Sequence, residues 1–434
     1  MTTKRVTIAL AGTAAVLATH LGAWTVADAA PTDRAAVARA ADVRTDRDRP
    51  ESKIQAREPD GFRVRKGVTF NGPGSQTING KVLRAIDHTP KGGKIRAMTW
   101  NFNSWVFVNR LRAAHFRGVS VRVLMARSLA YEQGPNGPFH VLQRALAGGN
   151  NAKRKRSMRS WFRTCSHSCR GTAGAMHSKM YLFSKVGRSR QVVMSSTANM
   201  TGSAASNQWN DMYTVTNRRT PYRTSLKVFN EAGRDRPAPY HTYKSGKIRG
   251  WFHPNKGRPD IAYQMLNRVR CLGAKGAGIN GRTSIRIAMD VFNGGRGAKF
   301  ARKVKALHRS GCDVRVVYSQ LSRESWEILQ GVPRNHLVSD RDGDGAYDIY
   351  LHMKAMSISG HYGDDRGARI VFQGSANWSG LGLIADEQGM VIRRDGVEKK
   401  YGRQISRLFR IHLTSVPPVV ARSQIGDPYR NMEK

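Results

Sequence analysis

The chain is short of acidic residues, of cysteine and of long apolar runs. Of its 434 residues, 30 are Asp or Glu and 73 are Lys or Arg, which gives a formal net charge of +43. This excess concentrates anions at the surface and favours nucleic acid or anionic membranes as partners, without separating the two. A solubility or salt adaptation is the alternative explanation. Beyond residues 1–29, no stretch is long and apolar enough to span a bilayer.

The four cysteines fit an oxidising, extracellular compartment. Cys165 and Cys169 are close enough in sequence to close one small loop, and Cys271 and Cys312 remain as the second pair. We expect these two disulfides among the three pairings that four cysteines allow. A zinc site built on Cys165, His167 and Cys169 is the alternative.

The N-terminus has the pattern of a secretory signal peptide. Residues 1–29 start with two basic residues, continue with an apolar core and end in the small-residue sequence Ala27-Asp28-Ala29. A membrane anchor is the alternative. Residues 30–60 have no apolar period and are expected to form a flexible leader of the mature protein. The prediction is a secreted, extracellular protein.

One arrangement of residues occurs twice in the same order. A His-x-Lys element is followed by an apolar run, then by a second apolar run that leads into a Ser-containing segment and an Asn. The His, Lys and Asn of the two copies are His177, Lys179 and Asn199, then His352, Lys354 and Asn377. On a strand, residues two apart point to the same face. An imidazole therefore lies beside a fixed cation in each copy, which suits binding of a phosphoryl group without an obligatory metal.

The segments upstream of each copy also resemble each other. Each has a strand, an amphipathic helix, a Gly-containing turn and a second strand, which predicts a right-handed βαβ unit. The expected elements are a strand at 94–100, a helix at 106–117 and a strand at 119–125, then 284–290, 298–310 and 312–318. We therefore predict an α/β fold built by tandem duplication. The halves are 61–236 and 237–434, joined by a Pro- and Gly-punctuated link.

An acidic run in the second half has two interpretations. Asp340, Asp342, Asp344 and Asp348 have the spacing of the first ligands of a calcium-binding loop, although its twelfth position is Leu351. An acidic turn without a metal is the alternative.

The first half also carries a basic insertion before His177 that contains Trp161 and Phe162. This insertion is interpreted either as a segment whose aromatic rings contact an anionic head group or as a solvated loop pinned by a disulfide. A loop over residues 360–367 is expected between the two strands of the second copy.

The duplicated His-x-Lys and Ser-x-Asn elements resemble those of the phospholipase D superfamily, over residues 60–434. Trp251-Phe252-His253-Pro254 and Gly311-Cys312-Asp313-Val314 are similar to the small secreted bacterial branch of that superfamily. The resemblance implies two pseudo-twofold-related α/β lobes, each a mixed β-sheet flanked by helices, with one active site at the lobe interface. It also implies a phosphohistidine intermediate and no metal or cofactor.

Residue by residue, the resemblance assigns His177 as nucleophile and His352 as general acid and base, with Lys179 and Lys354 beside them. It implies phosphate-binding roles for Asn199, Asn377, Ser196 and Ser375, and places a His-orienting carboxylate at Asp211 and Glu387. The chain departs from the family pattern at Ser184 and Ser359, where the motif has Asp, and at Ser195, where Gly is usual.

The leading functional hypothesis is a secreted phospholipase D that cleaves the head-group phosphodiester of phospholipids, with transphosphatidylation as an extension. Its partners would be phospholipid and an anionic membrane surface, and the protein is expected to be a monomer. A nuclease of the same superfamily, acting on nucleic acid, is the first alternative. A catalytically weak protein that binds anionic surfaces is the second.

Overall fold

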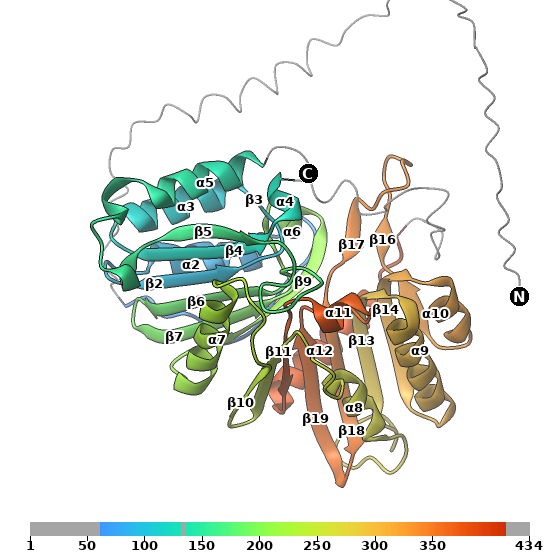
Figure 1. Ribbon diagram of the computed structural model, residues 1–434. Helices are drawn as coiled ribbons and strands as arrows, with labels where there is room; N and C mark the ends of the chain where they lie inside the picture. Colours follow the sequence, from blue (N-terminus) through green and yellow to red (C-terminus); the bar gives the residue numbers. More distant parts are fainter. Residues whose placement is uncertain (1–60, 132–135, 414–434) are drawn as a thin grey trace, which may run out of the picture. The chain divides into compact units, whose positions relative to one another are not determined.

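Two nine-stranded mixed β-sheets flanked by helices make up the part of the chain that this computed structural model describes, residues 61–131 and 136–413 (Figure 1). The predicted α/β fold is confirmed. The expected signal peptide and leader lie outside the described residues. Within the described residues, no helix has the length and apolarity that a membrane crossing needs.

The first sheet has the strand order β16-β17-β9-β7-β6-β2-β4-β5, with β1 pairing on β9. Its strands are β1 (Gly67–Asn71), β2 (Lys94–Met98), β4 (Ser120–Ala126), β5 (Trp161–Cys165), β6 (Lys179–Val186), β7 (Ser189–Ser196), β9 (Gln208–Val215), β16 (Val338–Ser339) and β17 (Ile349–Leu351). A separate short pair joins β3 (Phe102–Asn103) to β8 (Met200–Thr201).

The second sheet has the order β10-β11-β20-β19-β18-β13-β14-β15, with β12 pairing on β18. Its strands are β10 (His241–Ser245), β11 (Ile248–Phe252), β12 (Val269–Arg270), β13 (Ser284–Phe292), β14 (Asp313–Leu321), β15 (Arg334–His336), β18 (Lys354–Tyr362), β19 (Asp365–Gly374) and β20 (Gln388–Ile392). The run β9-β7-β6-β2-β4-β5 of the first sheet therefore has its counterpart in β20-β19-β18-β13-β14-β15.

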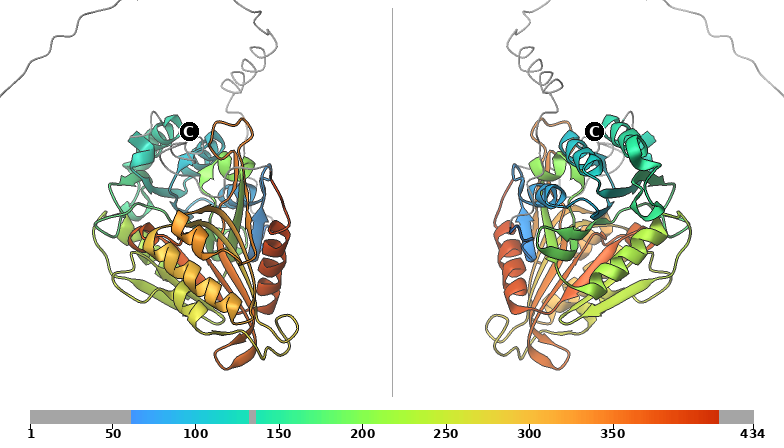
Figure 2. Two further views of the ribbon diagram at one scale, coloured as in Figure 1. Left: turned by 90° about the vertical axis from the view of Figure 1, so that its right-hand side faces the viewer. Right: turned by 90° about the vertical axis from the view of Figure 1, so that its left-hand side faces the viewer.

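Helices cover both sheets, as the two side views show (Figure 2). They are α2 (Thr77–Asp87), α3 (Trp105–Phe116), α4 (Ser128–Tyr131), α5 (Gly137–Ala147), α6 (Ser203–Ser206), α7 (Arg219–Ala232), α8 (Ile261–Asn267), α9 (Gly294–Arg309), α10 (Arg323–Ile328), α11 (Leu381–Ile384) and α12 (Asp395–Leu408), with short 3₁₀ turns at Gly149–Asn151 and Arg156–Met158. The helices α3 and α9 connect the parallel pairs β2–β4 and β13–β14, where the sequence predicts βαβ units.

The two sheets share one segment of chain. β16 and β17 come from the second half of the sequence, yet β17 pairs in parallel with β9 of the first sheet. β17 runs directly into His352, so this exchange carries the second His-x-Lys element up against the first sheet. The division at residue 236, which lies between α7 and β10, stays a proposal.

The loop expected over residues 360–367 is much shorter in the structure. β18 continues to Tyr362 and β19 begins at Asp365, with a register shift between Gly360 and Tyr362. Gly360 has a φ of 139°, and a Cβ there would lie 2.6 Å from the Thr283 hydroxyl. Glycine therefore allows the bulge, so the strand does not end there.

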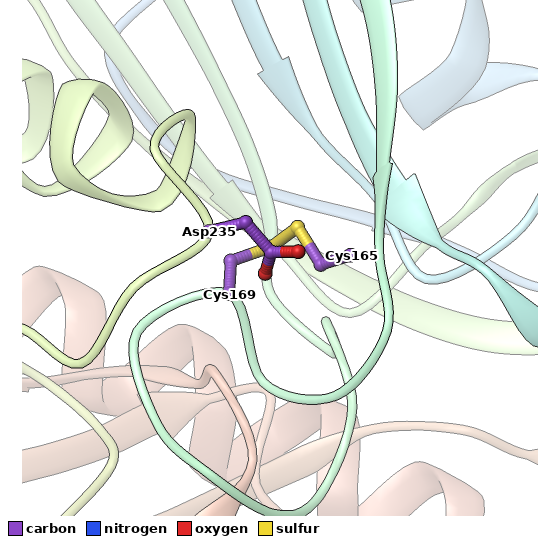
Figure 3. Close-up of side chains that lie close together, drawn as sticks. All are labelled: Cys165, Cys169 and Asp235. Atoms are coloured by element: carbon purple, nitrogen blue, oxygen red, sulfur yellow. A yellow bond between two sulfur atoms is a disulfide. The ribbon is translucent and has the colours of Figure 1, made fainter.

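The cysteines form the two expected pairs, Cys165–Cys169 and Cys271–Cys312. Asp235 lies beside the first disulfide, as the close-up shows (Figure 3). Because a disulfide sulfur is not a thiolate, it cannot serve as a zinc ligand. The zinc alternative is therefore wrong.

The loop closed by Cys165 and Cys169 contacts the second half of the chain at Asp386. The backbone N–H of Cys169 donates to Asp386 Oδ2, and the buried guanidinium of Arg170 lies nearby. No partner for Asp386 Oδ1 exists among the described residues. Burial raises the pKa of Asp386 to about 7, although the Arg170 charge and the Cys169 hydrogen bond oppose this. Asp386 is thus a buried carboxyl that keeps its proton more readily in the folded protein.

Replacement Asp386→Asn should stabilise the fold increasingly as pH rises from 4 to 8. The pKa of Asp386 is raised above its ordinary value of 3.8, so the stabilising contribution of its proton is complete below about pH 4 and is lost as pH passes about 7. Asn keeps the acceptor for Cys169 and never ionises. Each pKa unit corresponds to about 1.4 kcal/mol, so thermal denaturation at several pH values should resolve the effect.

The exposed variant Asp235→Asn is the matched control, and its melting temperature should follow the wild type at every pH. A melting-temperature difference between Asp386→Asn and wild type that does not change with pH would contradict the prediction.

Candidate active site

Each His-x-Lys element docks on the strand that the other half contributes. The backbone N–H of His177 donates to Asp386 O, and that of His352 donates to Trp209 O, both at 3.0 Å. Asp386 and Glu387 immediately precede β20, and Trp209 lies in β9. The two elements therefore meet across a pseudo-twofold relation, and the site forms only when both halves are in place.

Both imidazoles line one cavity of about 480 Å³. Its walls combine small and apolar side chains with hydroxyl, amide and two carboxylate groups. The lining residues are Trp100, Asn101, Gly174, Ala175, His177, Asn199, Thr201, Ser203, Gln208, Asp290, Val291, Tyr350, His352, Asn377, Ser379, Leu381, Gly382, Ala385 and Glu387. Among the described residues, no Lys or Arg belongs to this lining, although the chain contains 73 of them.

Glu387 orients His177. The distance between His177 Nδ1 and Glu387 Oε1 is 2.7 Å, and Glu387 is almost fully buried. Burial alone would raise the pKa of Glu387, but His177 and Lys179 outweigh it and hold that pKa below its ordinary value. Burial lowers the pKa of His177, with Glu387 opposing the shift. The pair therefore presents a neutral imidazole whose Nδ1–H faces a carboxylate, which leaves Nε2 as the free nitrogen.

The expected orienting role of Asp211 is wrong, and Asn210 takes that place. His352 Nδ1 lies 2.9 Å from Asn210 Oδ1. Neighbouring residues on a strand point to opposite faces, so Asp211 is directed away and accepts a hydrogen bond from the Tyr401 hydroxyl at 2.6 Å. Burial raises the pKa of Asp211 to about 6. The two histidines thus have different partners, a carboxylate for His177 and an amide for His352.

The two lysines lie fully buried beside the histidines. Lys179 Nζ donates to His177 O at 2.6 Å, and Lys354 Nζ donates to His352 O at 2.8 Å. Lys354 also forms a 2.9 Å ion pair with Asp290. Burial lowers the pKa of both lysines, and carboxylates nearby oppose it. Burial lowers the pKa of His352 well below 6.5, and repulsion from the ammonium groups of Lys354 and Lys179 acts in the same direction.

Both asparagines of the repeated element line the cavity. The side-chain Oδ1 of Asn199 accepts hydrogen bonds from the backbone N–H groups of Trp100 and Asn101, at 3.2 and 3.4 Å. This fixes the amide so that Nδ2 is the end available to a ligand. The Oδ1 of Asn377 is buried without a hydrogen-bond partner among the described residues.

The phosphate-binding role expected for Ser196 and Ser375 needs correction, because neither residue lines the cavity. The Ser375 hydroxyl donates to the Glu387 carboxylate, and the Ser196 hydroxyl donates to Asp211 O at 3.0 Å. The residue that matches Ser375 in the first half is Thr197, whose hydroxyl lies 2.9 Å from Asn210 Oδ1. The hydroxyls of Ser375 and Thr197 thus hold the groups that orient the histidines.

The two serines that replace the motif Asp lie at the far ends of their strands and accept hydrogen bonds from backbone N–H groups. Ser184 accepts from Lys94 at 2.9 Å, and Ser359 accepts from Gly278 at 3.2 Å. Neither lines the cavity. Neither serine therefore takes part in the hydrogen bonds of the two imidazoles.

The acidic turn and the aromatic insertion do not join this cavity. Oxygens of Asp340, Asp342 and Asp348 come within 4.8 Å of one another, but Leu351 at the twelfth loop position is buried in β17. The turn thus lacks the bidentate carboxylate of a calcium loop.

In the insertion, Phe162 is buried in the core, and Trp161 stacks on Phe229 with ring centroids 5.6 Å apart. The expected stacking or insertion of Trp161 and Phe162 at a head group is therefore wrong, and a contact of the basic residues of the insertion with an anionic group stays a prediction.

Sequence reasoning missed Asn210, Thr197, Asp290 and Trp100. Asn210 and Thr197 stand at almost the same intervals from Asn199 as Glu387 and Ser375 do from Asn377, so a strict alignment of the two copies points to them. Asp290 and Trp100 lie upstream of the repeated element, and only the strand register brings them to the site.

A family model described as "Cardiolipin synthase, PLD-like domain" matches residues 82–231. Among solved structures, phosphatidylserine synthase of Haemophilus influenzae Rd KW20 is similar with a TM-score of 0.54 and 11% identity, over 84% of this chain and 92% of that one. Polyphosphate kinase from Porphyromonas gingivalis is similar with a TM-score of 0.50 and 13% identity, over 81% of this chain. The chain spans 52% of that kinase. No curated protein sequence matches the chain significantly.

At these identities, the similarity to the two solved structures shows the fold alone. Their similarity is consistent with the two mixed sheets flanked by helices that this chain forms. The family match covers the first of the two copies, and the second copy repeats its His, Lys and Asn around the same cavity. On this evidence, residues 82–231 form a PLD-like domain, which supports membership of the chain in the phospholipase D superfamily.

Proposed function

We propose that the protein is a secreted phospholipase D that hydrolyses the head-group phosphodiester of phospholipids through a phosphohistidine. The observation that carries the choice of substrate is the lining of the cavity. Its walls contain Trp100, Val291 and Leu381 with several small residues, and among the described residues no Lys or Arg joins them. A nucleic acid carries phosphates on both sides of the cleaved one and needs cations for them. A phospholipid places a single phosphodiester between an apolar and a small polar part.

The different partners of the histidines support His177 as the nucleophile. When a neutral imidazole attacks phosphorus through Nε2, the ring becomes cationic, and the Glu387 carboxylate at Nδ1 stabilises that charge. His352 faces the amide of Asn210 and lies near two ammonium groups. A proton on His352 is therefore released readily, which suits donation to the leaving oxygen.

In the first step, His177 Nε2 forms a bond to phosphorus while the bond to the head-group oxygen breaks. His352 gives its proton to that oxygen, and the head-group alcohol departs. In the second step, His352 takes a proton from water as the water oxygen attacks phosphorus. The bond to His177 breaks, phosphatidic acid leaves, and both imidazoles return to their starting states. The lysines and the Asn199 amide stabilise the non-bridging oxygens.

Replacement of either histidine by Ala should abolish or strongly reduce the release of choline from phosphatidylcholine. Loss of the nucleophile in His177→Ala removes the covalent route, and loss of the general acid in His352→Ala should lower kcat by about 10²- to 10⁴-fold. Activity should persist in the presence of a chelator.

His361→Ala is the matched control, because His361 lies on β18 at the end remote from the cavity and contacts Leu272 O. Undiminished turnover in both active-site variants would overturn the mechanism. Faster chelator-resistant cleavage of single-stranded DNA than of lipid would favour the nuclease alternative.

The order of attack predicts where a covalent adduct forms. With a phosphatidyl-p-nitrophenol substrate, whose leaving group needs no proton, His352→Ala should release nitrophenol in a burst. It should also accumulate a phosphatidyl adduct on His177, because hydrolysis of the phosphohistidine needs His352 as the base. Mass spectrometry of peptides produced at neutral pH would locate the adduct. An adduct on His352 in His177→Ala, with none on His177 in His352→Ala, would reverse the assignment.

An exposed apolar pair at the mouth supports a lipid surface as the working environment. Leu381, which also lines the cavity, is 66% exposed, and Ile384 one turn later on α11 is 42% exposed. The double replacement Leu381→Ser with Ile384→Ser should lower activity on anionic vesicles by on the order of a hundred-fold, because burial of each side chain in lipid stabilises binding by about 1.5 kcal/mol. Activity on monomeric short-chain lipid should fall less, because only Leu381 of the pair lines the cavity.

Leu272 and Ile279 form a matched control pair with 62% and 45% exposure. They flank Arg282, just before β13, at the sheet end opposite the cavity. Their replacement by Ser should leave vesicle activity intact. Equal losses on vesicles and on monomeric lipid in the Leu381 and Ile384 variant would contradict interfacial binding.

A further inference from the structure

The two halves of the site differ at one position where the fold repeats. In the second half, Met289 pairs with Lys354 across β13 and β18, and Asp290 is the next residue. In the first half, β2 pairs with β6 as far as Met98 and Met180, and one further step along both strands brings Lys179 opposite the residue before Trp100. One lysine therefore has an indole ring as its neighbour and the other has a carboxylate.

The contacts of the two lysines follow this difference. Lys179 Nζ lies 5.8 Å from the centre of the Trp100 ring, a cation–π arrangement. Lys354 Nζ lies 2.9 Å from Asp290 Oδ2, and both side chains of this pair are at most 5% exposed. The positive charge of Lys354 is thus already matched by a carboxylate before any substrate binds.

Asp290 belongs to the half of the cavity that contains His352. Its side chain is part of the cavity lining, and its backbone N–H donates to Met353 O at 3.0 Å, between His352 and Lys354. Under the proposed mechanism, the head-group alcohol leaves on the side of His352. Asp290 is therefore the carboxylate next to the departing group, whereas Glu387 is engaged with His177.

The wall beside the departing group presents a carboxylate and no Lys or Arg side chain. Asp290 belongs to the cavity lining, whereas Lys354, its ion-pair partner, does not. A cationic group on the leaving alcohol would therefore meet the Asp290 carboxylate with no ammonium or guanidinium group of the described lining in competition. A further anion at this place would be repelled, since charges interact strongly where water is excluded.

We propose that Asp290 is a specificity-determining residue that makes the site select phosphodiesters whose leaving alcohol carries a cationic amine. The inference rests on the proposed function, because it needs a phosphodiester whose head group leaves beside His352. It goes beyond that function by naming the charge class of the head group and the residue that selects it.

The test compares two head groups that differ in charge but hardly in shape. The substrates are short-chain monomeric phosphatidylcholine and its neutral isostere, the 3,3-dimethylbutanol ester, and the readout is phosphatidic acid, the product of both. Wild type should prefer the choline ester in kcat/KM by on the order of ten-fold, as expected for one nearby charge. Asp290→Asn should bring this ratio close to one, and Asp290→Glu should keep it above that of Asp290→Asn.

The ratio isolates head-group selection, because any change in how Lys354 holds the phosphoryl group affects both substrates alike. Asp342→Asn, which removes the same charge from the exposed turn, is the matched control and should keep the wild-type ratio. Equal kcat/KM values for the two esters in wild type would overturn the proposal even if Asp290→Asn failed to fold. An unchanged preference in a folded Asp290→Asn variant would overturn it too.

Failure of the underlying function gives a different result. In that case wild type forms phosphatidic acid from neither ester, and no ratio exists. Turnover of both esters that depends on His177 but shows no charge preference leaves the phospholipase function standing and removes the role of Asp290.

Discussion

Two ammonium groups buried at one seam set the conditions for the rest of the site. Lys179 and Lys354 are both inaccessible to solvent, and a buried charge is costly unless its surroundings supply partners. Each lysine donates to the backbone carbonyl of the histidine beside it, so the His-x-Lys spacing serves the lysine as well as the imidazole. The carboxylate beside Lys354 is Asp290 of the same sheet, but Glu387, which offsets the charge of Lys179, comes from the other half of the chain. Folding of the two halves together and formation of the phosphoryl site are therefore one event.

The duplicated frame is symmetric, but its chemistry is not. Both carboxylates of the cavity, Asp290 and Glu387, come from the second half, and the equivalent positions of the first half hold Trp100 and Asn210. Attack and departure at phosphorus need one group that becomes cationic and one that gives up a proton. Identical partners would give the two imidazoles similar pKa values, whereas different partners push them apart. The unequal halves thus provide two roles from one repeated element.

The repeat itself was predictable, since local patterns specify it. Alternating apolar residues and the His-x-Lys spacing identify the strands, and the upstream strand–helix–strand pattern identifies the βαβ units, whose observed bounds differ from expectation by a few residues. The prediction of Asp211 as the group that orients His352 is wrong by one residue, because the orienting group is an amide and not the expected carboxylate. On a strand that single step selects the opposite face, so Asn210 meets His352 and Asp211 meets Tyr401.

Asp290 and Trp100 lay beyond sequence reasoning for a different reason. Asp290 stands in β13 and Trp100 two residues beyond the end of β2, each many residues before its His-x-Lys element. Its place beside a lysine depends on the register between two antiparallel strands. Apolar runs specify that such strands pair, but a buried strand that is apolar on both faces tolerates several registers in sequence terms. The register then decides which residue near the strand end lies beside the lysine. Because the ends of β2 and β13 carry different residues over equivalent lysines, the charge of the site is decided at positions outside the repeated motif.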